Sequence, residues 1–167
     1  MRSFKIIMLV AVLAIAAFFL FNDQRDNMQQ GFYDKDSVIN QEGDTHSYRH
    51  YDQNDKALPD YGLDLKFGSF DGYDTFYRFD VSQAGQVTVK YNTRVDKGRF
   101  KIVMAAPGRK LTKLAEGSGA GSKTLKLEPG DYRVKIVGDN ATGSVKMSVS
   151  TDNGITTVLE GDEFLAR

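Results

Sequence analysis

The sequence contains no cysteine, no tryptophan and only two histidines among its 167 residues. The absence of cysteine excludes disulfides, thiol nucleophiles, thiolate metal sites and a lipoprotein-type cysteine anchor. The absence of tryptophan counts against a sugar site built on an exposed indole ring. Lys+Arg and Asp+Glu are both 22, so no net charge attracts a polyanion to the whole chain, and we expect no nucleic-acid partner.

The longest apolar run lies at the N-terminus and is preceded by Arg2 and Lys5. Residues 1–21 therefore predict a signal anchor or a signal peptide. The one small-residue cleavage pattern, Ala14-Ile15-Ala16, lies inside the apolar run, which favours an uncleaved anchor over a secreted protein. Positive charge before the run places the N-terminus inside and residues 22–167 outside, as in a single-pass protein of a bacterial cell membrane.

The rest of the chain divides into three parts by composition. Residues 22–45 are rich in Asp, Asn and Gln without a sustained period, and predict a polar linker. Residues 46–152 predict one β-sandwich domain, and residues 153–167 a C-terminal tail.

Alternation of apolar and polar residues dominates the predicted domain. In Val87–Asn92 and Tyr132–Ile136, every second residue is apolar, which is typical of antiparallel strands with one face in a core and one in water. The strands are expected near residues 47–52, 61–67, 74–81, 86–95, 99–105, 110–115, 123–128, 131–138 and 143–150. Turn signals separate them at Phe70-Asp71-Gly72, Gln83-Ala84-Gly85, Asp96-Lys97-Gly98, Pro107-Gly108, Glu128-Pro129-Gly130-Asp131 and Gly138-Asp139-Asn140.

The same alternation predicts an all-β fold and its core. The expected core residues are Leu65, Phe67, Tyr77, Phe79, Val81, Val87, Val89, Tyr91, Phe100, Ile102, Met104, Leu125, Leu127, Tyr132, Val134, Ile136, Val145, Met147 and Val149. A charge at Tyr132 would lie in this core, whereas the alternation directs Lys135 to water, so Lys135→Asp is expected to be tolerated.

Three segments resemble the bacterial pre-peptidase C-terminal domains. Asp74–Val81, followed by Gly85 and Val87–Val89, looks like their opening strands. Leu127–Ile136 resembles their L-x-P-G-x-Y-x-V-x-V strand pair, and Gly143–Val149 their closing strand. The resemblance covers about residues 74–150 and implies a jelly-roll-like accessory module of a secreted protein, without catalysis of its own. We expect no peptidase among these residues, which departs from the usual setting of that family.

Two polar groups are candidates for a site. Asp71, Asp74 and Asp80 lie around a turn and could hold Ca²⁺ through oxygen ligands, but their spacing matches no known calcium loop and turn chemistry is the favoured explanation. His46 and His50 open a strand, where residues four apart are about 13 Å distant, so we expect exposed polar residues and no metal or catalytic pair there. No other cofactor is expected.

A basic sheet surface is the third candidate. It would consist of cations at predicted outward positions: Lys90, Arg94, Lys101, Lys126, Arg133, Lys135 and Lys146. Such a surface could bind an acidic wall polymer, or could serve only to keep the sheet soluble. The leading hypothesis is a membrane-anchored, non-enzymatic binding or structural module whose partner is a surface protein or wall polymer. The alternatives are an accessory domain of a secreted hydrolase system and a small-ligand or calcium-binding sandwich.

Overall fold

The computed structural model describes residues 31–54, 62–106 and 108–160. In this part, the one helix is the single turn α2 (Asp36–Ile39), and the strands are β1 (Thr45–Ser47), β2 (His50–Gln53), β3 (Leu63–Val81), β4 (Gly85–Ala105), β5 (Thr112–Glu116), β6 (Gly119–Leu127), β7 (Gly130–Thr151) and β8 (Ile155–Leu159). All strand pairs are antiparallel, which confirms the all-β prediction. The predicted anchor lies outside the described residues, and within them no helix has the length and apolarity to cross a membrane.

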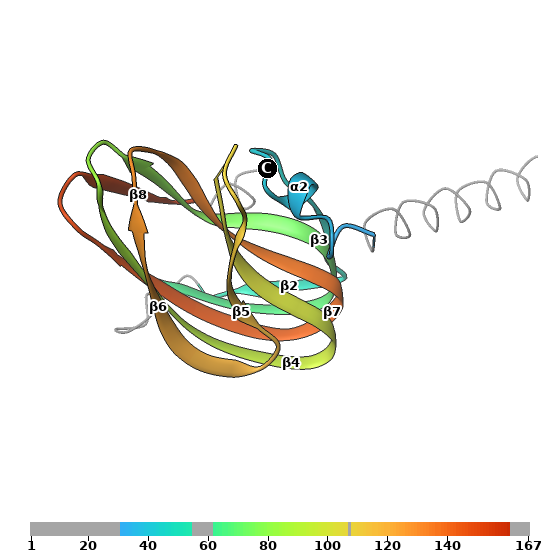
Figure 1. Cartoon of the computed structure of the whole chain (residues 1–167). Coiled ribbons are helices and arrows are strands. Elements are labelled where there is room, and N and C mark those ends of the chain that lie inside the picture. Colours follow the sequence, from blue (N-terminus) through green and yellow to red (C-terminus); the bar gives the residue numbers. More distant parts are fainter. Residues whose placement is uncertain (1–30, 55–61, 107, 161–167) are drawn as a thin grey trace, which may run out of the picture.

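Four long stretches of chain form the body of the domain in the order β3, β7, β4, and β5 followed by β6. β7 therefore lies between β3 and β4, and β5 and β6 pair with successive parts of β4. The long strands bend so that each contributes to two layers (Figure 1). This order, repeated in both layers, is the connectivity of a jelly roll.

We name the two layers by what lies outside them. The open layer consists of β2, residues 63–67 of β3, 143–151 of β7 and 85–95 of β4, and β6. The covered layer consists of β1, β8, residues 72–81 of β3, 130–138 of β7 and 99–105 of β4, and β5.

Three predicted turns prove to be bends inside strands. The signals at 70–72, 96–98 and 138–140 lie within β3, β4 and β7, where the chain passes from one layer to the other. The pairing register shifts at these points in β3 and β4, and Gly72 has a φ of +100°, which a side chain rarely adopts. The sequence thus located these changes of direction correctly, but the prediction that the strands end there was wrong.

The core lies between the layers and matches the predicted core. Sixteen of the nineteen predicted residues are buried in one cluster, and Tyr91, Leu125 and Val149 pack against it while partly buried. The rings of Phe67, in the open layer, and Phe100, in the covered layer, stack with centroids 4.8 Å apart. This contact joins the two layers across the interior.

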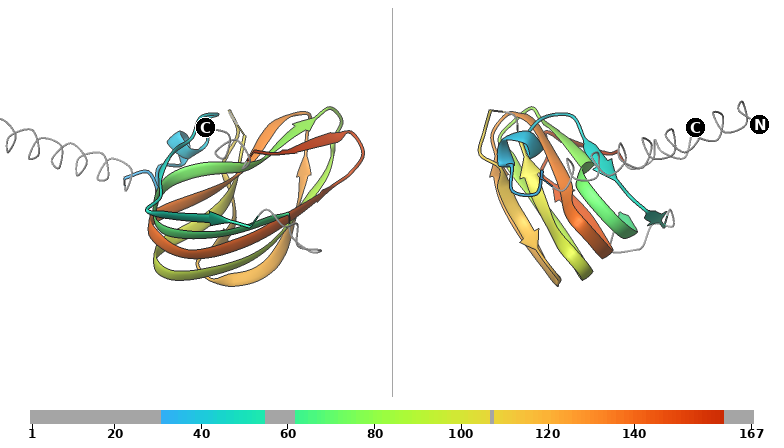
Figure 2. Two further views of the ribbon diagram at one scale, coloured as in Figure 1. Left: turned by 180° about the vertical axis from the view of Figure 1, so that it is seen from behind. Right: turned by 90° about the vertical axis from the view of Figure 1, so that its right-hand side faces the viewer.

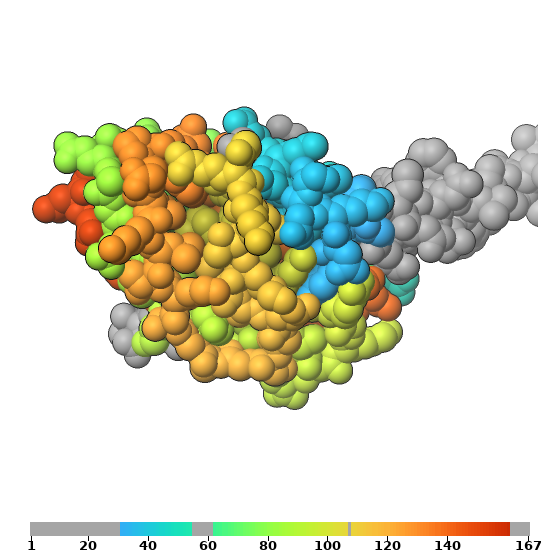
Figure 3. Space-filling view, viewed as in Figure 1, coloured from blue at the N-terminus to red at the C-terminus, as the bar shows by residue number. Residues whose placement is uncertain are grey.

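A second, smaller cluster lies on the outer side of the covered layer. Tyr33 and Ile39, from the N-terminal segment, are 2% and 0% exposed and pack with Tyr73, Val103 and Val137. Figures 2 and 3 show this blue segment lying against the sheet beside the yellow strand β5. The predicted polar linker of residues 22–45 is thus part of the packed domain from residue 31 onward.

The domain also extends further at its C-terminus than the sequence predicted. β8 falls in the predicted tail of residues 153–167, yet it pairs with residues 77–81 of β3. Ile155 of β8 is 9% exposed and belongs to the main core. The tail prediction missed this strand because Ile155–Leu159 is short and follows a polar turn.

The buried tyrosines make the fold sensitive to alkali. Burial raises the pKa of Tyr77 from 10.0 to about 12, and burial also raises that of Tyr48. The proton is therefore held more tightly in the folded state, so its contribution to stability is complete below about pH 10 and disappears as the pH rises to about 12. For Tyr77 alone, we expect the free energy of unfolding to fall by about 2 to 3 kcal/mol across this range.

Urea unfolding at a series of alkaline pH values measures this loss. Tyr77→Phe removes the ionisable group and should make the decline shallower, at the cost of the hydrogen bond that the Tyr77 hydroxyl donates to the Met147 carbonyl. An equally steep decline in Tyr77→Phe would show that Tyr77 is not responsible.

Candidate binding surface

The seven cations predicted to form one basic surface lie on two different faces. Lys90, Arg94, Lys126 and Lys146 are on the outer face of the open layer. Lys101, Arg133 and Lys135 are on the outer face of the covered layer and are only 7%, 5% and 0% exposed. The prediction that these three face water was wrong, because residues 32–44 cover this side of the sheet.

Lys135 has the most complete set of contacts among the three covered cations. Its ammonium group donates hydrogen bonds to the carbonyls of Gln41 and Gly43, each at 2.8 Å, and lies 3.0 Å from Asp44. It also lies 4.9 Å from the centre of the Tyr73 ring. Burial lowers the pKa of Lys135, and the carboxylate of Asp44 opposes this shift. The lysine thus fastens the N-terminal segment to β7.

Lys101 and Arg133 contact the same segment less closely. The Lys101 ammonium lies 4.7 Å from the centre of the Tyr33 ring and 3.7 Å from Asp36. The Arg133 guanidinium lies 3.8 Å from Glu42. Because these cations are engaged under the N-terminal segment, they do not form part of an exposed basic surface.

The three aspartates proposed as calcium ligands are not brought together. Asp71 accepts a hydrogen bond from the Asn140 backbone N–H at 2.6 Å, Asp74 accepts one from the Tyr48 hydroxyl at 2.7 Å, and Asp80 is exposed near the other end of β3. Over the described ranges, no three His, Asp or Glu side chains form a group that could hold a metal ion. The structure therefore gives the calcium prediction no support.

The two histidines also lie apart. His50 is exposed on β2, whereas His46 on β1 is partly buried, with Nδ1 3.6 Å from Asp74. Burial raises the pKa of Asp74, and the nearby His46 opposes this shift. Asp44 accepts a hydrogen bond from the Thr75 hydroxyl at 2.8 Å. These polar contacts join the start of the domain to β3. They give His46, Asp44 and Asp74 a structural role.

The outer face of the open layer, which we call the open face, is polar from edge to edge. Its outward positions carry five cations, Lys66, Lys90, Arg94, Lys126 and Lys146, and two carboxylates, Asp52 and Asp64, a net charge of +3. The chain as a whole has a formal net charge of zero. Positive charge is thus concentrated on this face.

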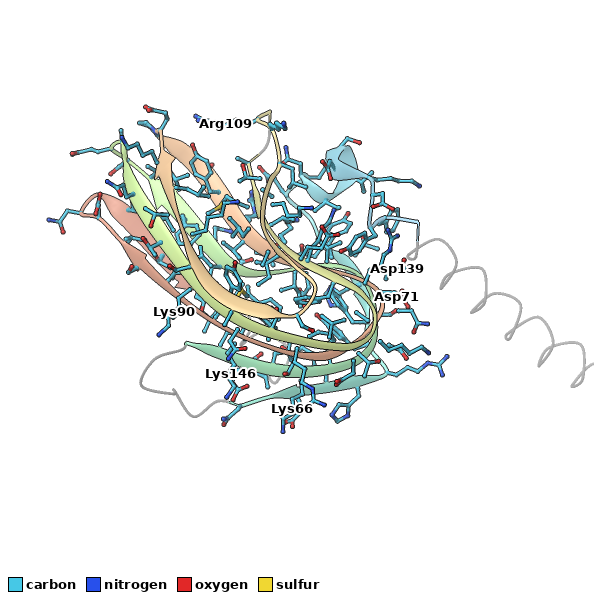
Figure 4. All side chains as sticks on the ribbon, turned by 60° about the horizontal axis from the view of Figure 1, so that its bottom comes forward. Lys66, Asp71, Lys90, Arg109, Asp139 and Lys146 are labelled. Carbon is cyan, nitrogen blue, oxygen red and sulfur yellow. The ribbon has the colours of Figure 1, made fainter. Side chains whose placement is uncertain are left out.

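Three of the cations form a row across neighbouring strands. From one lysine to the next, the row moves to the neighbouring strand and by two residues along it. Its members are Lys66 on β3, Lys146 on β7 and Lys90 on β4. Such diagonal neighbours lie about 7–8 Å apart. Figure 4 shows the three side chains on the same side of the molecule, away from Arg109. We call this row the lysine diagonal.

Hydroxyl and amide side chains flank the lysine diagonal. Ser144 is opposite Lys66, Asn92 is opposite Lys146, and Ser148 and Ser122 are on either side of Lys90. These groups can donate and accept hydrogen bonds. None of the outward positions of the open face carries Phe, Tyr or Trp.

Lys66 was absent from the sequence-based list of basic residues. The alternation of Leu63, Leu65 and Phe67, all buried, was the signal that could have placed Lys66 on the outer face. Lys66 is exposed, as are Lys90, Arg94 and Lys126.

No family model and no curated protein matches the chain. Carbohydrate-binding modules are among the solved structures that match. TmCBM61 in complex with β-1,4-galactotriose is 11% identical over 71% of this chain and 90% of that one, with a TM-score of 0.40. Xyl-CBM35 in complex with a glucuronic acid-containing disaccharide is 9% identical over 69% and 86%, with a TM-score of 0.37.

An exo-β-1,3-galactanase from Phanerochaete chrysosporium also matches. It is 12% identical over 65% of this chain, with a TM-score of 0.39, and this chain spans only 28% of that enzyme. Because similarity at this level carries no functional argument, the function has to be argued from the open face itself. The resemblance to pre-peptidase C-terminal domains stays a prediction.

Proposed function

We propose that the protein is a non-catalytic binding module that acts outside the cell and holds a polymer of the cell surface on its open face. The observation that supports this most directly is the contrast between the two outer faces. The N-terminal segment covers one of them and neutralises its lysines and arginine, whereas the other presents exposed cations and hydroxyl groups. An exposed sheet face suits an extended polymer better than a small molecule, which requires a concave pocket.

Membrane attachment through residues 1–21 is part of the same proposal. It rests on the apolar run and on the charge before it, and would keep the open face at the cell surface. Fractionation should find the full-length chain with the membranes and accessible to protease from outside. Recovery of a shortened chain from the medium would show instead that the segment is cleaved.

Blocking the open face should abolish binding. Thr88 and Ser148 both point outward in the open layer. The double variant Thr88→Phe/Ser148→Phe would therefore place two bulky rings on the open face and leave its charge unchanged. We expect the purified full chain, kept in detergent, to sediment with envelope material from which the membrane has been extracted, and this variant to remain in the supernatant. The variant should keep its β-sheet circular dichroism, because aromatic residues are well tolerated in strands.

A matched control places the same rings elsewhere. Ser37→Phe/Thr156→Phe alters two exposed positions, one on α2 and one on β8, that do not belong to the open face. This control should sediment as the unchanged protein does. If both double variants sediment normally, the open face is not the binding surface.

A further inference from the structure

We infer that the ligand of the open face is a carboxylated polysaccharide, bound along the lysine diagonal. This inference rests on the proposed function and names the chemistry of its ligand. It follows from three properties of the open face: the sign of its charge, the spacing of its cations and the side chains between them.

The sign of the charge favours an anionic ligand. The open face carries a net charge of +3, and Lys66, Lys90, Arg94 and Lys126 are exposed on it. Lys146 lies 3.4 Å from Asp64 and Arg94 lies 2.8 Å from Asp96, so at least these two cations are partly neutralised. Complementary charge speeds encounter and selects against ligands of the wrong sign.

The spacing of the cations favours a polymer with charges distributed along its length. Steps of about 7–8 Å separate Lys66 from Lys146 and Lys146 from Lys90. A single phosphate or lipid headgroup needs donors that converge on one point. On this face the charges form a line, which fits one carboxylate for each residue or pair of residues of a sugar chain.

The intervening side chains favour sugar over other polyanions. Ser144, Asn92, Ser148 and Ser122 lie opposite the lysines on neighbouring strands and can exchange hydrogen bonds with sugar hydroxyls. The absence of Phe, Tyr and Trp from the outward positions removes the ring on which a neutral sugar would stack. Recognition of a neutral polysaccharide would therefore lack a main source of affinity, whereas an acidic one retains its ion pairs.

The experiment measures binding of the purified full chain to defined polymers by affinity electrophoresis and calorimetry. Polygalacturonate and alginate represent the carboxylated class, dextran the neutral class, and polyphosphate and soluble glycerol phosphate the phosphate sources. We expect binding to the first two that weakens with added salt, as Debye screening requires, and none to dextran. Preferential binding to polyphosphate or to glycerol phosphate, or equal binding to dextran, would overturn the inference.

Variants test the place of binding. Lys66→Gln/Lys90→Gln/Lys146→Gln removes the lysine diagonal, and because three exposed ion pairs are each worth a few-fold, we expect Kd to rise about tenfold or more. The control Lys35→Gln/Lys97→Gln/Lys110→Gln removes the same charge from exposed sites outside the open face and should leave Kd almost unchanged. Equal losses in the two triple variants would mean that net charge, and not the diagonal, is responsible.

Single variants guard against misfolding. If the triple variant lost its β-sheet circular dichroism, Lys66→Gln and Lys90→Gln alone should each still weaken binding a few-fold. Failure of this inference is distinguishable from failure of the proposed function. If polygalacturonate and alginate do not bind but Thr88→Phe/Ser148→Phe still blocks sedimentation with envelope material, the open face binds a ligand of another class.

Discussion

The variant Lys135→Asp is expected to lose most or all of its folded structure. It would remove the ammonium group that binds two backbone carbonyls and lies 3.0 Å from Asp44, at a position that is 0% exposed. In its place a second carboxylate would face Asp44 and the same two carbonyls. Breaking a buried ion pair costs about 3 to 5 kcal/mol, and the reversed charge adds repulsion, so a loss of about 4 kcal/mol or more is expected.

Urea unfolding followed by circular dichroism measures this loss. The matched control is Lys126→Asp, which makes the same change at an exposed position of the open face and should alter stability by no more than about 0.5 kcal/mol. Lys135→Met should be intermediate, since it removes the cation and the two hydrogen bonds to carbonyls but keeps the volume and adds no repulsion. A Lys135→Asp protein as stable as the Lys126→Asp protein would show that the N-terminal segment is not packed on β7.

The variant Gly143→Ala should be strongly destabilising at the bend between the layers. A Cβ at this position would lie 1.9 Å from the carbonyl oxygen of Arg94 and 3.1 Å from the Cα of Val95. Both are backbone atoms of β4, so no side-chain rotation can relieve the clash. β4 and β7 would have to separate where Gly143 pairs with Val95, at an expected cost of about 3 kcal/mol.

Thermal unfolding provides the measurement, and Tm should fall by roughly 10 °C. Gly119→Ala is the control, because a Cβ there would meet no atom within 4 Å and the residue also lies in a strand. Alanine in place of glycine at such a site should leave Tm equal or slightly higher, through the reduced freedom of the unfolded chain. Equal falls in the two variants would mean that the bend tolerates a side chain.

The sequence predicted the core well because alternation depends on the strand itself. In β7, Tyr132, Val134 and Ile136 face the interior, as their spacing indicates. The residues between them, Arg133 and Lys135, were assigned to water on the same reasoning. Alternation shows that two faces exist, but whether the second face is covered depends on a segment some ninety positions earlier in the chain, as the Lys135–Gln41 hydrogen bond illustrates.

The sequence contains only a weak signal that the N-terminal segment covers this face of the sheet. Tyr33 and Ile39 belong to two short apolar pairs, Phe32-Tyr33 and Val38-Ile39, in an otherwise polar stretch, and no local period connects the pairs. Their burial depends on Tyr73, Val103 and Val137, outward residues of three different strands. The lysine diagonal was likewise only partly predictable, since it depends on the register between β3, β7 and β4, which the sequence does not specify.

The position of β7 determines when the domain can form during synthesis. Although β3 and β4 follow each other in the chain, neither pairs with the other, and β7 lies between them. Leu63 pairs with Met147, 84 positions later, so the central strand is the last of the long strands to leave the ribosome. A nascent chain that ends before residue 130 lacks the strand that joins its halves, and each half presents an unpaired edge. Such non-local pairing makes folding slow and confines it to the completed chain.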